Sequence, residues 1–178
     1  MVSVTKTVRD SITSLVADPS VGFNPTLVKV CNDYNVQPFL IDFSNNSRNF
    51  FAGYYGAKAI METTNTKFPL ICLYTIKSTN TNQQKFQVFS GTILLGIDVY
   101  LSYGKSSAFG NTDLLADAVE DTIYNVFNSE ANYGFYSAAS GDLEYNGDIS
   151  VTRSSLTKDA YNWLQALQVR FTVDFFAS

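Results

Sequence analysis

The segment from Gly91 to Tyr103 alternates apolar residues with mostly polar or small ones over its whole length. Successive residues of a β-strand point to opposite faces, so a period of two predicts a strand with one buried face and one mostly unburied face. A globular strand usually has about 5–6 residues, so this strand is long. The apolar positions are Ile93, Leu95, Ile97, Val99, Leu101 and Tyr103, and the positions between them include Thr92, Gly96, Asp98 and Ser102.

Three other segments also predict strands. Residues 163–175 alternate in the same way, residues 68–77 are apolar on both faces as in a central strand, and residues 36–43 place apolar side chains on one side. Asn146-Gly147 predicts a hairpin turn between two short strand segments. The apolar positions change from even to odd numbers near Ser90-Gly91, which predicts a bulge or bend there.

Apolar residues at helical spacing predict helices at residues 3–17 and 112–128, and Asn24-Pro25 predicts the start of a short helix that ends near Tyr34. Runs of strands with helices kept separate from them predict an α+β fold with a mostly antiparallel sheet. The two long helices can cover the hydrophobic face of the long strands. We expect one domain over residues 1–178, with 44–58 and 129–142 as loops or assembly segments.

Composition excludes several classes of function. The chain has 12 Lys and Arg against 16 Asp and Glu, a net charge of −4 that argues against a surface built to hold phosphate backbones. Without histidine, the usual general base and the commonest zinc ligand are missing. We therefore expect no enzyme, no catalytic residue, no metal and no cofactor. No secretion signal or membrane span is evident, which predicts a soluble protein made in a cytoplasm.

The two cysteines, Cys31 and Cys72, lie far apart among apolar residues. We expect buried free thiols, with a disulfide as the alternative. Asp98 lies on the less apolar side of the long strand, where we expect an exposed cross-strand partner and not a proton donor.

Four acidic residues follow one stripe of the helix predicted at 112–128. Such a stripe is typical of a solvated face, and a surface directed at a partner or a channel is the alternative. Catalysis by paired carboxylates would need an apolar cleft that raises one pKa, which is the opposite situation. The stripe consists of Asp113, Asp117, Glu120 and Asp121.

Aromatic residues make up 15% of the chain, and several of them lie in glycine-containing segments. Aromatic residues of this kind pack locally or anchor contacts between proteins, and stacking of a ligand is a third possibility. The candidates are Tyr54, Tyr55, Tyr133, Phe135 and Tyr136.

Taken together, the chain resembles the tail terminator (tail completion) family of long-tailed bacteriophages. The resemblance covers mainly residues 60–176, and element order and pattern carry it. It rests on the N-terminal helix, Phe68-Pro69-Leu70-Ile71 before a hairpin, Gly91-Thr92-Ile93-Leu94-Leu95-Gly96-Ile97-Asp98-Val99-Tyr100, the helix from Asp113 to Phe127, and the ending Trp163…Phe171-Thr172-Val173. Residues 18–58 depart from the family pattern, because an extra helix and an aromatic loop precede the expected first strand.

The resemblance implies a structural virion protein that forms a ring, typically a homohexamer. Such a ring caps the tail tube, ends its polymerisation and provides the interface to the head–tail connector or neck protein. The partners would be the chain itself, the tail tube protein and the connector, with genomic DNA passing through unbound, and assembly would take place in the host cytoplasm. The acidic stripe would then face the lumen or an interface. The alternatives are a neck or head-closure protein, a small-molecule- or peptide-binding α+β module, and an enzyme without histidine that uses carboxylates or a tyrosine.

Overall fold

The computed structural model describes residues 4–44, 47–53, 67–80, 90–104, 112–129, 137–138, 141–158 and 162–177. Two helices come first in this part of the chain, followed by three strands, a further helix and four strands. The elements are α1 (Val4–Ala17), α2 (Phe23–Asp33), β1 (Phe50–Phe51), β2 (Leu70–Asn80), β3 (Ser90–Gly104), α4 (Thr112–Asn128), β4 (Ser137–Ala138), β5 (Gly141–Arg153), β6 (Thr157–Lys158) and β7 (Asn162–Ala177).

The strands of the described part form one sheet in the order β1-β2-β3-β7-β5-β4, with β6 paired to β7 at its side. The two longest strands, β3 and β7, pair antiparallel from Ser90↔Phe176 to Gly104↔Asn162. β2 and β5 flank this pair and are also antiparallel to it, whereas the short β1 is parallel to β2. An α+β fold with a mostly antiparallel sheet is thereby confirmed.

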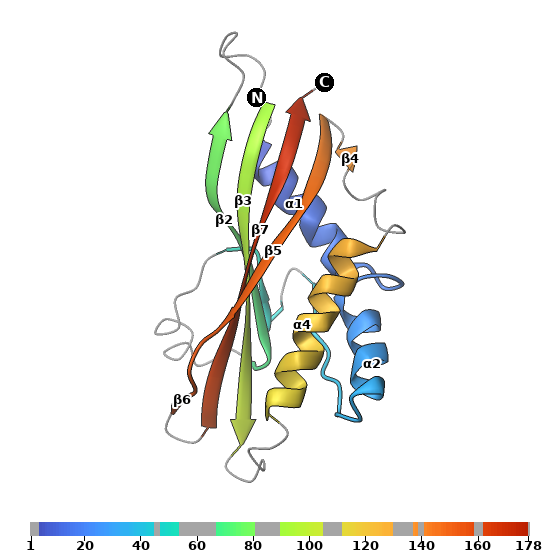
Figure 1. The fold of residues 1–178 in the computed structure, drawn as a ribbon, viewed down its shortest axis with the longest axis vertical. Helices are drawn as coiled ribbons and strands as arrows, with labels where there is room; N and C mark the ends of the chain where they lie inside the picture. Colours follow the sequence, from blue (N-terminus) through green and yellow to red (C-terminus); the bar gives the residue numbers. More distant parts are fainter. Residues whose placement is uncertain are drawn as a thin grey trace.

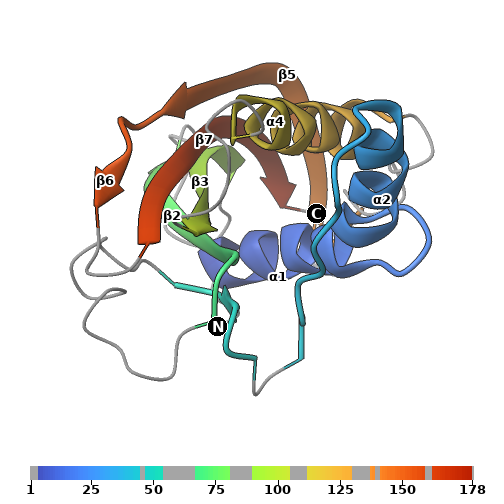
Figure 2. The ribbon, with the colours of Figure 1, turned by 90° about the horizontal axis from the view of Figure 1, so that it is seen from below.

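The three helices of the described part lie on one side of the twisted sheet (Figures 1 and 2). The odd-numbered residues of β3 and β7 point toward the helices and form the core with Val8, Ile12 and Phe127. The opposite face, which we call the helix-free face, carries a smaller apolar cluster of Leu70, Cys72, Tyr74 and Tyr100. The helices at 3–17 and 112–128 therefore cover the hydrophobic face of the long strands, as predicted.

The helix α2 begins at Phe23 after an N-cap at Gly22, and not at the predicted Asn24-Pro25. A Cβ atom at Gly22 would lie 2.5 Å from the carbonyl oxygen of Asp18 and 2.6 Å from that of Val16. Because real Cβ atoms do not approach so closely, only glycine fits this tight turn between α1 and α2.

The predicted strand at 36–43 is wrong, because this segment pairs with no strand of the described part. Side-chain amides satisfy its backbone instead. Asn24 donates from Nδ2 to the carbonyl of Ile41 and accepts from its N–H at 2.9 Å, while Asn49 contacts Leu40 and Asp42 in the same manner. Ile41 is nevertheless buried, so the predicted apolar side is correct even though the strand is not.

The predicted hairpin turn at Asn146-Gly147 is also wrong. Both flanking segments pair with the same strand, since Tyr145 lies opposite Val173 and Ile149 lies opposite Phe171. The register shift between Tyr145 and Ile149 makes this site an irregularity within the single strand β5.

The bulge predicted near Ser90-Gly91 is not found on the described side of that site. From Ser90 onward, β3 keeps an unbroken register with β7, and the residues before Ser90 lie outside the described part. The register shift next to β3 lies in β2, between Thr75 and Lys77. There the burial of β2 also ends, because every residue from Ile76 to Asn80 is exposed.

Cys31 and Cys72 are buried free thiols, which confirms the prediction. They belong to the two different apolar clusters on opposite faces of the sheet. Burial raises the pKa of the Cys31 thiol, so this group remains protonated near neutral pH. Among the residues placed in the structure, no helix is long and apolar enough to cross a membrane.

The buried hydroxyls of Tyr103 and Tyr145 predict how stability depends on alkaline pH. Burial, with smaller contributions from Asp113 and Asp148 respectively, raises the pKa of each to about 12. In the unfolded chain tyrosine ionises near pH 10, so between about pH 10 and 12 the folded state holds protons that the unfolded state has lost. The free energy of unfolding should therefore fall as the pH rises through this window.

Urea unfolding followed at several pH values across the window measures this slope. The double variant Tyr103→Phe, Tyr145→Phe should show a shallower decline than the wild type, because neither phenylalanine can ionise. Identical slopes for the two proteins would contradict the assignment.

Candidate functional site

The helix-free face of the sheet carries a buried ionic cluster of three side chains. Asp98 of β3 is fully buried, and its Oδ1 accepts a hydrogen bond from Nη1 of Arg170 on β7 at 2.7 Å. Its Oδ2 accepts a hydrogen bond from the hydroxyl of Tyr74 on β2 at 3.0 Å. The guanidinium carbon of Arg170 lies 5.5 Å from the centre of the Tyr74 ring, within the range of a cation–π contact. We call these three residues the Tyr74–Asp98–Arg170 cluster.

Gly96 makes this cluster possible. The sheet register places Gly96 between Tyr74 on one side and Arg170 on the other, and Asp98 lies two residues along the same face. A Cβ atom at Gly96 would lie 2.8 Å from Cζ of Tyr74 and 3.1 Å from Nη1 of Arg170. The absence of a side chain therefore lets the tyrosine and the arginine meet across the central strand.

The expectation of an exposed Asp98 is corrected, because its side chain is 0% exposed. The expected cross-strand pairing is present, as a diagonal contact with Arg170. The sequence alone did not reveal the burial, since the partners of Asp98 lie 24 and 72 residues away. A glycine within a long strand was the available signal, because it often marks a close approach of neighbouring groups.

The acidic stripe of α4 is partly paired within the chain. Arg153, at the end of β5, holds Glu120 with both Nε and Nη2, at 3.1 and 2.6 Å. The same Nη2 lies 2.6 Å from Asp117. Burial alone would lower the pKa of Arg153, but the hydrogen bonds to Glu120 and Asp117 outweigh it and the pKa is raised. This group therefore stays charged and fastens α4 to β5.

The other two acids of the stripe differ from each other. Asp121 accepts a hydrogen bond of 2.6 Å from the hydroxyl of Tyr34, just after α2, and this bond is the main reason that the pKa of Tyr34 is raised. Asp113, in the first turn of α4, is exposed and forms neither a hydrogen bond nor an ion pair within the described part. Three of the four acids thus join elements of the same chain, and Asp113 alone among them is left for another partner.

The five aromatic residues predicted as interface candidates lie outside the described residues, and their placement is not described. They are Tyr54, Tyr55, Tyr133, Phe135 and Tyr136.

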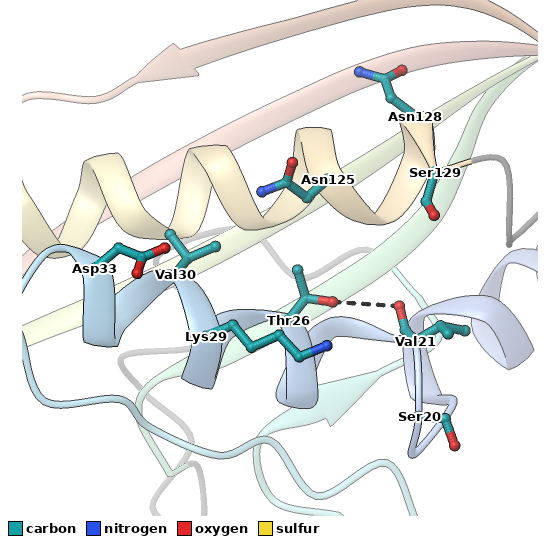
Figure 3. A pocket seen from close by; sticks show the side chains of 9 residues that line it. All are labelled: Ser20, Val21, Thr26, Lys29, Val30, Asp33, Asn125, Asn128 and Ser129. Atoms are coloured by element: carbon teal, nitrogen blue, oxygen red, sulfur yellow. Dashed lines mark hydrogen bonds between the residues drawn. The ribbon is translucent and has the colours of Figure 1, made fainter.

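A polar cleft of about 480 Å³ separates α2 from the C-terminal end of α4 (Figure 3). Lys29 and Asp33 of α2 and Asn125 and Asn128 of α4 line it together with residues of the turn before α2. The hydroxyl of Thr26 is oriented toward the carbonyl oxygen of Val21, at 3.4 Å. The lining offers hydrogen bonds without a recognisable catalytic arrangement. Within the described ranges, no group of three or more His, Cys, Asp or Glu side chains is placed to hold a metal ion.

The chain matches no protein-family model and no curated protein. The chain presents two charged features on opposite sides of the sheet, namely the Tyr74–Asp98–Arg170 cluster on the helix-free face and the acidic stripe of α4 on the helix side.

Proposed function

We propose that this chain is a structural virion protein, and that it forms a ring that caps the tail tube of a long-tailed bacteriophage. In this role the ring ends tube polymerisation and presents a surface to the head–tail connector. The resemblance of the sequence to tail terminator proteins supplies the identity of the partners.

The observation that carries the proposal is the arrangement of the long strands. β3 and β7 pair over 15 residues, and the helices on either side of β3 in the sequence, α1 and α4, pack on the same face. The N-terminal helix, the 112–128 helix and the final long strand therefore combine into one unit. These are the elements on which the resemblance rests, so their joint packing supports it.

The sheet also leaves surfaces for neighbours. The parallel partner β1 pairs with β2 only at Ile71 and Cys72, and no other described strand lies beside the outer edge of β2. The final residues of β2, from Ile76 onward, are exposed. A head-to-tail contact that closes into a ring covers such edges, whereas an isolated subunit leaves them open.

The ion pairs that the acidic stripe forms within the chain change what this surface would do if it faced the lumen of the ring. Arg153 neutralises part of the charge of Asp117 and Glu120, so the stripe repels phosphates less than four unpaired carboxylates would. We accordingly place Asp113 first among the four acids as a candidate for a contact with another chain.

Measurement of the mass in solution tests the proposed ring. The purified chain should form one discrete oligomer with a mass near six times 19.7 kDa, or should form it only when tail tubes are present. Analytical ultracentrifugation with and without tubes distinguishes these two cases. A protein that stays monomeric in both conditions would contradict the proposal and would favour a monomeric binding module.

A further inference from the structure

Arg170 is held by one end of its guanidinium group only. Its Nη1 donates to Oδ1 of Asp98 at 2.7 Å and to the carbonyl oxygen of Val169 at 2.7 Å. Its Nε and Nη2 donate no hydrogen bond within the described part of the chain, and 28% of the side chain is exposed. Nε and Nη2 form one of the donor pairs with which a guanidinium group binds a carboxylate through two parallel hydrogen bonds.

Arg153 shows how this chain uses the same pair of donors. Its Nε and Nη2 both bind Oε2 of Glu120 within the chain. Arg170 presents the equivalent edge on the helix-free face, and the stacking on Tyr74 together with the bonds to Asp98 and Val169 fixes its orientation. An arginine fixed in this way loses little further side-chain freedom when it binds an oxyanion.

We propose that the Nε–Nη2 edge of Arg170 binds a carboxylate of a second copy of this chain. This inference rests on the proposed ring and names one of its contacts. Tyr74 and Asp98 position the Arg170 side chain, and the neighbouring subunit supplies the carboxylate.

The charge balance of the chain favours a carboxylate of an identical subunit as the partner of Arg170. Acidic residues outnumber basic ones by 16 to 12, so a ring of identical subunits has carboxylates to offer, and a pI near 4.7 disfavours a phosphate backbone as the occupant. Arg170 lies on the helix-free face, and the exposed Asp113 belongs to α4 on the other side of the sheet. A head-to-tail contact brings opposite sides of neighbouring subunits together.

The variant Arg170→Lys tests the contact. Lysine keeps a positive charge beside Asp98 but lacks the planar pair of donors. We expect its subunits to associate about tenfold or more weakly than the wild type, because the two parallel hydrogen bonds are lost while the charge is kept. Sedimentation over a range of concentrations measures the association, and thermal unfolding of the dissociated subunit shows whether the fold is kept.

Two further variants make the outcome decisive. Arg153→Lys is the matched control, because it loses the same donor pair where the chain already uses it internally, and its association should stay close to that of the wild type. If Arg170→Lys does not fold, Asp98→Asn combined with Arg170→Gln removes the ion pair without leaving a buried charge, and it should show the same weakened association.

The results separate the two proposals. Arg170→Lys rings as stable as those of the wild type would overturn the contact and leave the ring intact. A wild type that never associates, with or without tail tubes, would overturn the ring and the contact with it.

Discussion

Arg170→Gln should lower the free energy of unfolding of the isolated subunit by about 3–5 kcal/mol, because it leaves a buried carboxylate without its charged partner. Asp98 is 0% exposed, so water cannot replace the lost ion pair. Asp98→Asn should cost clearly less, since the side chain of Arg170 is 28% exposed and its charge can be solvated. Urea unfolding of the two variants measures this asymmetry.

The double variant Asp98→Asn, Arg170→Gln provides the control. It removes both charges at once, so it should be more stable than Arg170→Gln alone despite carrying one more substitution. Equal losses for the two single variants, with an additive double variant, would show that the carboxylate of Asp98 is not effectively buried.

Phe127→Ala should lower the free energy of unfolding by about 3–5 kcal/mol, the usual cost of a cavity left by a buried phenylalanine. The Phe127 ring is 1% exposed, and its centre lies 4.6 Å from that of Phe171 on β7 and 6.1 Å from that of Tyr145 on β5. The contacts of the Phe127 ring hold α4 against two neighbouring strands, so removing this ring loosens the helix from the sheet. Chemical unfolding followed by circular dichroism measures the change.

Leu114→Ala is the matched control on the same helix. Leu114 is a large apolar residue, but it is 38% exposed, so its truncation should change the free energy of unfolding by about 0.5 kcal/mol or less. Similar losses for Phe127→Ala and Leu114→Ala would contradict the account of how α4 packs.

The sequence predicted the long elements because their periodicity is strong. Apolar and polar residues alternate over many positions in β3 and β7, and α4 has a clear apolar stripe. In these elements the local pattern of apolar residues matches the face that is buried in the fold. The segment at 36–43 failed for a physical reason. Its alternation is genuine, but the amides of Asn24 and Asn49 satisfy its backbone, and a pattern of apolar residues does not specify which groups satisfy the backbone.

The candidate site was harder to predict, because it depends on register across three strands. The local sequence pattern predicts that Asp98 is an exposed charge on the less apolar side of a strand. In the fold Asp98 is buried, because Tyr74 and Arg170 meet over Gly96 and both contact its carboxylate. The acidic stripe was placed correctly on α4, but its pairing with Arg153 requires the position of β5. Both corrections concern contacts between residues far apart in the chain, and no local pattern contains them.

We propose that this chain caps a tail tube as a ring, and electron microscopy of tubes grown with and without the chain is the sharpest test of that role. The chain should shorten the tubes and add a ring-shaped cap at one end of each. Tubes that grow to the same length with bare ends, at every concentration of the chain, would contradict it.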